Sequence, residues 1–524
     1  MKPSLRLHPS VPAIVFVIWW VVATLVFPDR MLNADGDMLR HIRHGEEMLR
    51  QGSLITSDPF SFTRGGEPFV AFEYGSQLLL ALVHRAAGLA GVAIFAGLLI
   101  ATTYAVLTRF LLARGVDALL AYLVSVGAAV LGAVHWSARP HLLTLLLVAV
   151  LLHWLEPGPR RRIWPLVPIF ALWANLHGGF VFGLVVLGIY LAGCVGEMLL
   201  ARGGSDGVAD ARAAWRDRAL YYAKALAAAG AATFLTPHGW RVHQHIITFF
   251  GEPFLLDNTH EFMSPDFHEV VGKLLLVVLL GTITLLTLSP RRPELPRLLL
   301  ILASVSFVLT ARRNIPLFGA TVLPILALHF DAAWRRLPDW RGIRAVFDRD
   351  AKLGRTAPLV ALLCLAFGAL AFSGGRVGGF PLVPNRLDPT QFPVEVAARA
   401  RAEGAEGRIF HDFIWGGYLL YAWPEQKVFI DGGTDFYGAE LMRTYMDITG
   451  LQPGWRDSLA RWEISLALLP AGSALASELA REPAWRVRDC DRTAVLLERG
   501  GAGVPDTVRL RACADPAPAA RAAR

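Results

Sequence analysis

The chain has 524 residues, of which 54% are hydrophobic and only 18% are charged, and its mean hydropathy is +0.43. A soluble domain carries about 25% charged residues, so this composition excludes a purely water-soluble protein and a disordered one. The formal net charge is +8 and the isoelectric point is about 9.5. A basic balance is also typical of nucleic-acid binding, and the positions of the Lys and Arg residues decide whether that interpretation holds.

Long apolar runs separated by basic connections predict an α-helical polytopic membrane protein, because a helix needs roughly 20 apolar residues to cross a bilayer. No small-x-small cleavage site follows the first run, so we interpret it as an uncleaved span rather than a signal peptide. About eleven spans are expected, at 11–28, 90–112, 117–135, 140–155, 162–175, 178–200, 219–236, 270–289, 297–311, 315–331 and 357–373. The shorter segment 75–88 carries His84 and Arg85 and is expected to be an interfacial or re-entrant helix.

The basic residues predict the orientation of these spans. With the N-terminus in the cytoplasm, the inward connections hold more than twice as many Lys and Arg residues as the outward loops. An odd number of spans then places the C-terminal segment outside, as expected for a multi-pass protein of a bacterial inner membrane. The basic excess is therefore a topology signal, and we expect the lipid bilayer and no nucleic acid among the partners.

The domain organisation follows from this pattern. We expect a transmembrane domain over 1–373 with large outward loops at 29–74 and 237–269, an extracytoplasmic α/β domain over 374–515, and a disordered tail at 516–524. In the outer domain the expected strands are 408–410, 427–430, 464–469 and 493–497, and the expected helices are 392–402, 439–444 and 474–480. The motifs at 415–418 and 431–437 are expected to form Gly-rich strand-turns.

The four cysteines divide between the two expected domains. Cys194 and Cys364 lie in spans, where we expect them to pack. Cys490 and Cys513 lie in the outer domain, where an oxidising compartment allows a disulfide. The sequence leaves open whether their Cα atoms approach closely enough to form one.

The first outward loop carries the most informative polar residues. Asp35 and Asp37 follow the first span, and Asp37 and His41 share one face of an expected short helix. One interpretation makes Asp35 a helix cap; the other makes Asp35 or Asp37 a general base at the membrane surface, with His41 in substrate binding. Two carboxylates two residues apart can also hold a divalent metal, so the cofactor stays open. Further along, Asp58 begins a turn and Glu73 precedes the next helix, and both are candidate substrate-binding residues.

Other candidate substrate-binding residues also fall on the expected outer side: Arg139, Asn175, His177, His238, Glu261, Arg312 and Arg313. Arginine binds phosphate bidentately, so the three arginines suit a lipid-phosphate group. The alternatives are a charged cap or a lipid-headgroup contact for Arg312 and Arg313, and a simple Gly-Gly turn after His177. The histidines between 237 and 269 fit no standard metal-ligand spacing, and we expect solvated loop side chains there.

Several motifs together resemble a known superfamily. They are D-x-D-x-x-x-H at 35–41, DPFSFT at 58–63, G-E-P-F at 66–69 followed by Glu73, A-R-P-H at 138–141, W-A-N-L-H-G-G-F at 173–180, T-P-H-G at 236–239, E-F-M-S-P at 261–265, R-R-N-I-P at 312–316, W-G-G-Y-L at 415–419 and F-I-D-G at 429–432. Their order resembles bacterial membrane proteins related to the GT-C glycosyltransferases, which include protein-mannosyltransferase-like and aminoarabinose-transferase-like enzymes. Such proteins use polyprenyl-phosphate sugars, and an acidic residue of their first outward loop activates the acceptor.

The resemblance implies a GT-C-like helical membrane domain and a membrane glycosyltransferase. It would move a sugar from a polyprenyl-phosphate carrier to an envelope glycan, lipid or protein at the outer face of the membrane, with inversion of the anomeric carbon. Asp35 and Asp37 match the catalytic acidic positions. The alternatives are a transporter or non-catalytic assembly factor for lipid-linked polysaccharide, which would place ionisable residues near the bilayer midplane, and a membrane-anchored sensor.

Overall fold

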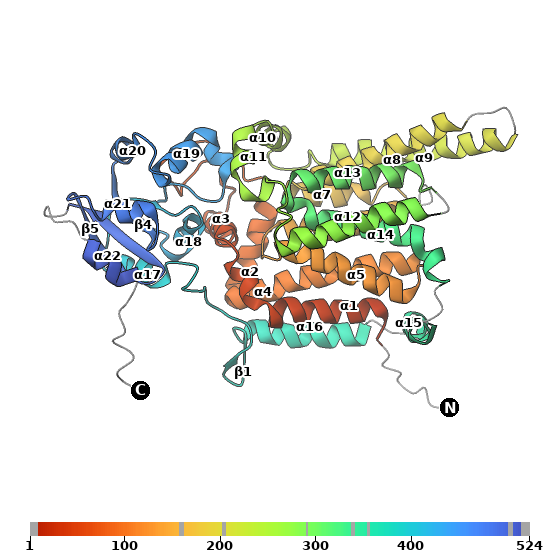
Figure 1. Cartoon of the computed structure of the whole chain (residues 1–524), viewed down its shortest axis with the longest axis horizontal. Helices are drawn as coiled ribbons and strands as arrows, with labels where there is room; N and C mark the ends of the chain where they lie inside the picture. Colours follow the sequence, from red (N-terminus) through yellow and green to blue (C-terminus); the bar gives the residue numbers. More distant parts are fainter. Residues whose placement is uncertain are drawn as a thin grey trace. The chain divides into compact units, whose positions relative to one another are not determined.

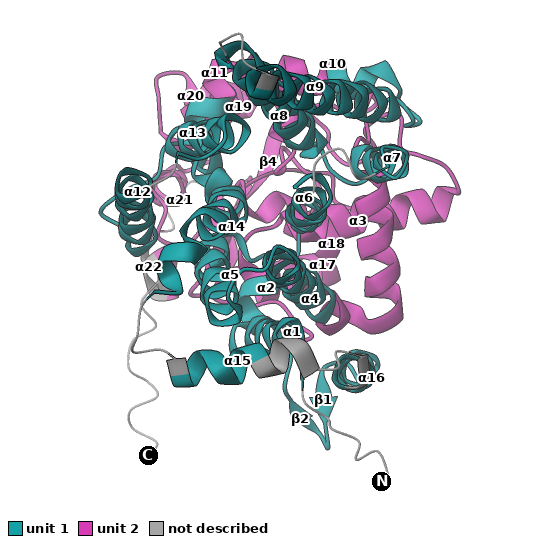
Figure 2. Cartoon of the chain, turned by 90° about the vertical axis from the view of Figure 1, so that its right-hand side faces the viewer, with its two compact units in different colours: residues 1–31, 93–243, 256–383 teal, residues 32–92, 244–255, 384–524 magenta. Residues whose placement is uncertain are grey.

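The computed structural model describes residues 9–156, 162–201, 206–289, 292–336, 341–353, 357–500 and 507–514. These divide into two compact units, coloured separately in Figure 2. Unit 1 comprises residues 1–31, 93–243 and 256–383, and unit 2 comprises residues 32–92, 244–255 and 384–524. The domain boundaries expected from the sequence stay a prediction, and the expected tail 516–524 lies outside the described residues.

Unit 1 is helical, and every expected span overlaps a helix. The helices with apolar runs are α1 (Val11–Val21, continued by a π-helical turn to Val26), α4 (Tyr74–Ala113, in unit 1 only from residue 93 on), α5 (Ala118–Gly132), α6 (His141–Leu155), α7 (Leu166–Leu176), α8 (Phe180–Leu200), α9 (Asp206–Ala232), α12 (Val270–Leu288), α13 (Leu295–Thr310), α14 (Ile315–Trp334) and α16 (Ala357–Phe372). Within the described residues, five helices are long and apolar enough to cross a membrane, and five further apolar helices are shorter. The number of spans stays a prediction.

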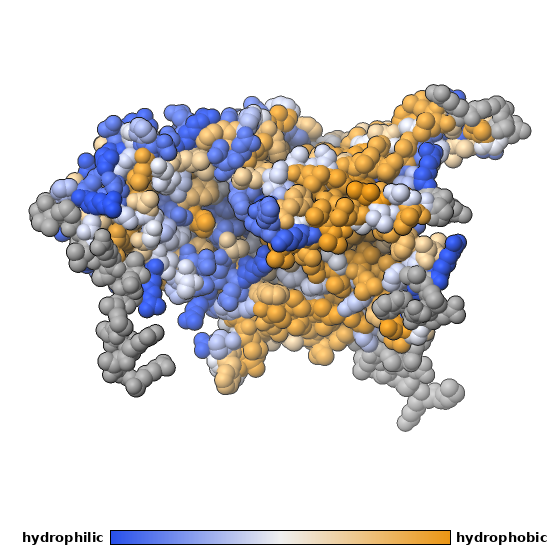
Figure 3. Space-filling view, viewed as in Figure 1, coloured by the Kyte–Doolittle hydropathy of each residue, from blue (hydrophilic) through white to orange (hydrophobic). Residues whose placement is uncertain are grey.

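The outer surface of these helices is apolar. Figure 1 shows α1, α5, α12, α14 and α16 running alongside one another, and Figure 3 shows hydrophobic residues covering this face. On α12 the exposed apolar side chains include Val270, Val277, Leu280, Ile283 and Leu288. Such a surface is costly in water and favourable in lipid, so the helical unit has the character of a membrane protein.

Helix α4 is interrupted at Gly88, which separates the segment expected at 75–88 from the span that follows. Gly88 has φ 63° and ψ −163°, a conformation that a residue with a Cβ rarely adopts. The side chain of Asn385 caps the second part, because its Oδ1 accepts a hydrogen bond from the N–H of Ala90 at 3.0 Å. The interfacial placement of 75–88 stays a prediction.

Five further helices lie between these apolar helices. They are α2 (Pro28–Asn33), α3 (Asp37–Gln51), α10 (Trp240–Phe250), α11 (Pro253–Asn258) and α15 (Arg341–Leu353). Of these, α3 begins within the acidic motif at 35–41.

Unit 2 contains a small mixed sheet, as the expected α/β domain requires. Its strands are β3 (Arg408–His411), β4 (Ile464–Pro470), β5 (Trp485–Cys490) and β6 (Ala494–Arg499), in the order β3-β4-β6-β5, and only β3 and β4 are parallel. The helices are α17 (Val394–Ala402), α18 (Trp415–Ala422), α19 (Thr434–Thr449), α20 (Trp455–Arg461), α21 (Ala474–Leu479) and α22 (Thr507–Ala514).

Three local predictions in this unit are wrong, and one strand was missed. Segment 431–437 was expected to be a strand-turn, but its residues 434–437 open helix α19. Segment 427–430 forms no strand: Val428 makes a single bridge to Ser61, because the first loop pairs with it there. Segment 415–418 is the start of helix α18 rather than a strand-turn. The missed strand is β5, which pairs with β6 at the edge of the sheet.

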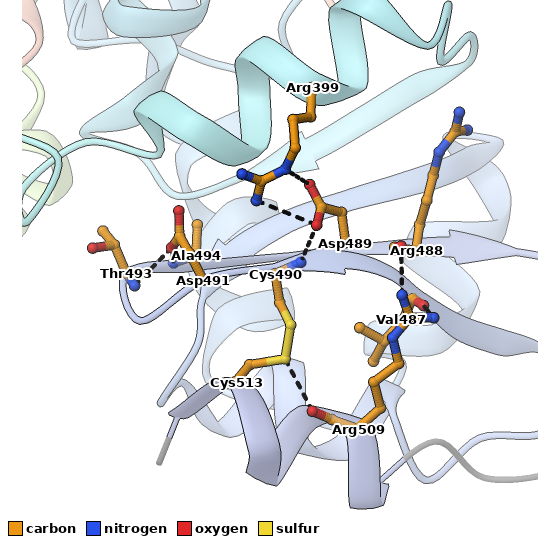
Figure 4. The surroundings of a disulfide bond; sticks show 10 residues. All are labelled: Arg399, Val487, Arg488, Asp489, Cys490, Asp491, Thr493, Ala494, Arg509 and Cys513. Carbon is orange, nitrogen blue, oxygen red and sulfur yellow. Dashed lines mark hydrogen bonds and ion pairs between the residues drawn. A yellow bond between two sulfur atoms is a disulfide. The ribbon is translucent and has the colours of Figure 1, made fainter. Parts of the chain in front are cut away.

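Cys490 and Cys513 form a disulfide that joins β5 to α22, with their Cα atoms 5.8 Å apart (Figure 4). The Arg509 guanidinium adds hydrogen bonds to the carbonyls of Val487 (2.7 Å) and Arg488 (3.1 Å). The disulfide and the hydrogen bonds of Arg509 thus hold helix α22 against the sheet. Of the other two cysteines, Cys194 is buried as expected, whereas the packing expected of Cys364 is wrong because its side chain is exposed on α16.

Candidate functional site

The acidic motif of the first loop forms the start of helix α3. Gly36 is the N-cap residue, and Oδ1 of Asp35 accepts a hydrogen bond from the N–H of Asp37 at 3.0 Å. Asp35 therefore holds the helix start, which is the capping interpretation that the sequence left open. Asp37 is the first residue of the helix and lies on the same face as Arg40 and His41.

Two glycines let other parts of unit 2 approach this helix start very closely. A Cβ on Gly417 of helix α18 would overlap the carbonyl group of Gly36. A Cβ on Gly432, in the loop before α19, would overlap the carboxylate of Asp37. The W-G-G-Y and D-G motifs are thus explained by contact with the first loop, and they place the loop 431–433 against Asp37.

Arg40 occupies the centre of the resulting cluster. Its Nε lies 3.8 Å from Oδ1 of Asp431, and the two side chains are only 11% and 5% exposed. The charges of three further carboxylates also act on this guanidinium, those of Asp37, Asp435 and Glu73. The charge of one buried cation therefore acts on four carboxylates, which come from three separate segments of the chain.

Asp431 is the most deeply buried of these acids. Its carboxylate accepts hydrogen bonds from the N–H of Gly433 (2.8 Å) and the hydroxyl of Tyr437 (3.1 Å). Burial raises the pKa of Asp431 to about 6, although the Arg40 charge and these hydrogen bonds oppose the rise. Asp431 can therefore take up a proton just below neutral pH.

His245 and Asp435 form a second pair in this unit. Nε2 of His245 donates to Oδ2 of Asp435 at 2.7 Å, and both side chains are mostly buried. Burial alone would lower the pKa of His245, but the bond to Asp435 outweighs it and raises that pKa. The expectation of a solvated loop histidine is wrong for His245. Of the residues in this cluster, Arg40, Asp431, Asp435 and His245 were not predicted as site residues, and the D-G-G motif at 431–433 was the available signal.

Three other predicted residues lie in the same unit. Nε2 of His41 is 3.8 Å from Oε2 of Glu73, and Nε2 of Gln77 donates to Nδ1 of His41 at 3.5 Å. Asp58 accepts hydrogen bonds from the N–H of Phe60 (2.9 Å) and from the hydroxyl of Ser61 (2.5 Å). Asp58 thus shapes the loop, whereas His41 contacts Glu73, one of the four acids of the Arg40 cluster.

The predicted basic residues lie in unit 1, where Glu261 gathers two of them. Nη1 of Arg139 is 2.5 Å from Oε1 of Glu261, and Nη1 of Arg313 is 4.0 Å from Oε2. Burial would raise the pKa of Glu261, but the two guanidiniums outweigh it and hold that pKa well below its usual range. Glu261 is therefore a carboxylate throughout the physiological range and orients Arg139.

His177 lies close enough to this set to feel the charges of Arg139 and Arg313. Its Nδ1 accepts a hydrogen bond from the N–H of Gly179 at 2.9 Å and also contacts the hydroxyl of Thr144 at 2.8 Å. The Gly-Gly turn after α7 therefore fixes the ring and leaves the proton of a neutral imidazole on Nε2. The turn interpretation and the site interpretation of this motif are compatible.

Three more of the predicted residues lie in unit 1: Arg312, Asn175 and His238. Nη1 of Arg312 bonds His260 at 2.8 Å, which commits this side chain to the neighbouring loop. Nδ2 of Asn175 donates to the carbonyl of Leu235 at 2.9 Å and so ties the end of α7 to the end of α9. His238 lies in the turn that leads into α10.

A metal site is not identified by these side chains. Within the described ranges, no group of three or more His, Cys, Asp and Glu side chains is placed to hold a metal ion. Asp35, one of the two carboxylates expected to share such an ion, uses Oδ1 at the helix start.

Comparison with solved structures shows which fold this chain resembles. The archaeal oligosaccharyltransferase AglB from Archaeoglobus fulgidus, in complex with an inhibitory peptide and a dolichol-phosphate, matches with a TM-score of 0.52 and 13% identity, over 88% of this chain and 69% of that chain. ArnT from Cupriavidus metallidurans, bound to undecaprenyl phosphate, matches with a TM-score of 0.50 and 14% identity, over 94% and 98%. No protein-family model and no curated protein matches the sequence. Both similar structures are membrane glycosyltransferases of the GT-C superfamily, so the GT-C-like fold predicted from the motifs is confirmed.

Proposed function

We propose that the chain is a membrane glycosyltransferase that moves a sugar from a polyprenyl-phosphate carrier to an acceptor of the bacterial cell envelope. The reaction takes place at the outer face of the inner membrane, with the N-terminus in the cytoplasm. The observation that carries the proposal is the carboxylate cluster around Arg40, at the start of the first outward loop, in a chain with the GT-C fold.

In the proposed step, Asp37 takes the proton of an acceptor hydroxyl, whose oxygen attacks the anomeric carbon of the sugar. The new bond to the acceptor forms as the bond between that carbon and the phosphate oxygen breaks, so the configuration inverts. The electron pair leaves with the polyprenyl phosphate. Asp37 is favoured over Asp35 because Asp35 already serves the backbone at the helix start.

Arg139 and Arg313 are the candidates to stabilise the departing phosphate. Preorganised cations aimed at developing negative charge act strongly in a partly buried site, and these side chains are 18% and 30% exposed. Arg312 fits this role less well because it bonds His260 and Glu269.

A transfer assay tests the assignment of the base. Purified protein receives a radiolabelled undecaprenyl-phosphate sugar together with envelope membranes as the source of acceptor. Because general-base catalysis contributes roughly 100- to 10,000-fold, Asp37→Asn should lower the turnover number by about that factor. The control Glu67→Gln, an exposed carboxylate of the same loop, should retain full turnover.

Full turnover by the double variant Asp35→Asn, Asp37→Asn would refute this mechanism. Binding of the labelled lipid without turnover by the unaltered chain would instead support the assembly-factor alternative. Movement of the label across proteoliposomes, without transfer, would support the transporter.

A further inference from the structure

A small hairpin follows the last helix of unit 1. Strands β1 (Arg376–Val377) and β2 (Phe380–Pro381) pair antiparallel just after α16, and residues 373–383 are here called the hairpin (Figures 1 and 2). The carbonyl of Gly375 accepts hydrogen bonds from the N–H groups of Leu382 (2.8 Å) and Val383 (3.0 Å). This segment, which is rich in Gly and Pro, is therefore a folded element whose backbone closes on itself.

Three apolar side chains of the hairpin are exposed, although Val383 at its end is buried. Val377 is 56% exposed, Phe380 76% and Leu382 46%, and Phe372 at the end of α16 is 75% exposed. In Figure 3 the hydrophobic colouring continues from the helical face to this region. An exposed apolar cluster of this kind marks a contact surface rather than a face that meets water.

The one charged side chain of the hairpin forms hydrogen bonds within the hairpin. Arg376 is the only charged residue between positions 373 and 385. Its guanidinium donates to the carbonyl of Gly379 from Nε (3.3 Å) and from Nη2 (3.2 Å). An irregular segment suits the boundary of a bilayer better when its backbone groups have partners, and these hydrogen bonds and the strand pairing supply partners for much of the hairpin.

The length of α16 places the hairpin at that boundary. The helix has 16 residues, so it is about 24 Å long at 1.5 Å per residue, whereas the hydrocarbon core is about 30 Å thick. Arg355, just before the helix, belongs to a basic connection expected on the cytoplasmic side. A helix that starts at the inner boundary thus ends about 6 Å short of the outer one.

We propose that the hairpin inserts into the outer leaflet of the bilayer, where Val377, Phe380 and Leu382 contact bulk phospholipid at the level of the acyl–headgroup boundary. The insertion completes the span that α16 leaves short. Arg376 lies at the same level, where its stem can stay in the apolar layer while its guanidinium reaches lipid phosphates.

Fluorescence quenching tests this placement without any need for activity. Cys364 is replaced by Ser, and Phe380→Cys or Leu382→Cys is labelled with bimane in the full chain, reconstituted into phospholipid vesicles free of polyprenyl lipid. Matched positions are Leu365→Cys, exposed on α16, and Ala402→Cys, exposed at the end of α17. The quenchers are brominated phospholipids in the bilayer and iodide in the water.

We expect positions 380 and 382 to be quenched by brominated lipid at least half as strongly as position 365, and by iodide much less than position 402. Quenching like that of position 402 would overturn the proposal. Protection from both quenchers would also overturn it, because protein rather than lipid would then cover the hairpin. If Phe380→Cys does not fold, Val377→Cys supplies the same measurement. Loss of transfer activity has no bearing on these outcomes.

Discussion

Replacing Arg40 by Met tests whether one buried cation holds the acidic cluster together. Arg40 and Asp431 are 11% and 5% exposed, so the substitution leaves a buried carboxylate without its cation and removes the opposing charge from Asp37, Glu73 and Asp435. Removing one partner of a buried pair costs about 3–5 kcal/mol. We expect the lower end, about 3 kcal/mol, because the 3.8 Å approach of Arg40 Nε to Asp431 is not a hydrogen bond and because Asp431 can take up a proton.

Thermal unfolding of the purified chain in detergent, followed by intrinsic fluorescence, measures this cost. For a unit of roughly 200 residues, 1 kcal/mol lowers Tm by about 2–4 °C, so Arg40→Met should lower Tm by about 6–12 °C. The control Arg401→Met removes an exposed ion pair with Glu425 and should cost less than about 1 kcal/mol. The double variant Arg40→Met, Asp431→Asn should recover at least about 1 kcal/mol, because no carboxylate is left at position 431. A Tm for Arg40→Met equal to that of Arg401→Met would refute the reasoning.

Three further predictions concern a pH effect, an anion-binding effect and the disulfide. Because the pKa of Asp431 is raised to about 6, folding favours its protonated form, so its contribution to stability is present below about pH 4 and is lost as pH rises through 6. Asp431→Asn should therefore gain stability relative to the unaltered chain between pH 4 and pH 7 in thermal melts, and a constant difference would contradict the burial argument. Glu261→Gln should tighten binding of undecaprenyl phosphate by about 1–2 kcal/mol, or roughly 5–30-fold, because Arg139 is no longer neutralised. Arg139→Gln should weaken this binding. If titration calorimetry shows that both variants change the affinity in the same direction, Arg139 is excluded as the phosphate ligand. Reduction of the Cys490–Cys513 disulfide, whose cysteines are 23 residues apart, should lower the free energy of unfolding by about 3 kcal/mol and expose α22 to proteolysis. If α22 stays protected from proteolysis after reduction, Arg509 alone holds this helix.

The membrane class and the positions of the helices could be read from the sequence because each of these features is local. A bilayer requires a continuous apolar run in each span, and a basic connection next to a run shows which side it faces. The start of α3 was equally predictable, since Asp35 and the helix it caps are neighbours in the chain. The ordered motifs added the GT-C-like fold, which the similar solved structures confirm.

The partners of these residues depended on contacts between distant segments. His245 and Asp435 are separated by 190 positions, and no local pattern distinguishes such a pair from two solvated side chains. Segment 427–430 has strand-like residues, but Val428 pairs instead with the first loop, through the N–H of Phe62 and the carbonyl of Phe60. Local propensity was overruled there by a tertiary contact.

The sequence by itself determined that this protein is a polytopic membrane protein with an acidic first loop and an α/β segment near its C-terminus. Hydropathy and charge record these features residue by residue, so they need no partner to be recognised. Only the tertiary structure decided that Arg40 gathers carboxylates from three separate segments and that Glu261 joins Arg139 to Arg313. The reason is physical: a buried charge is tolerated only when opposite charges approach it, and the fold alone determines which ones do.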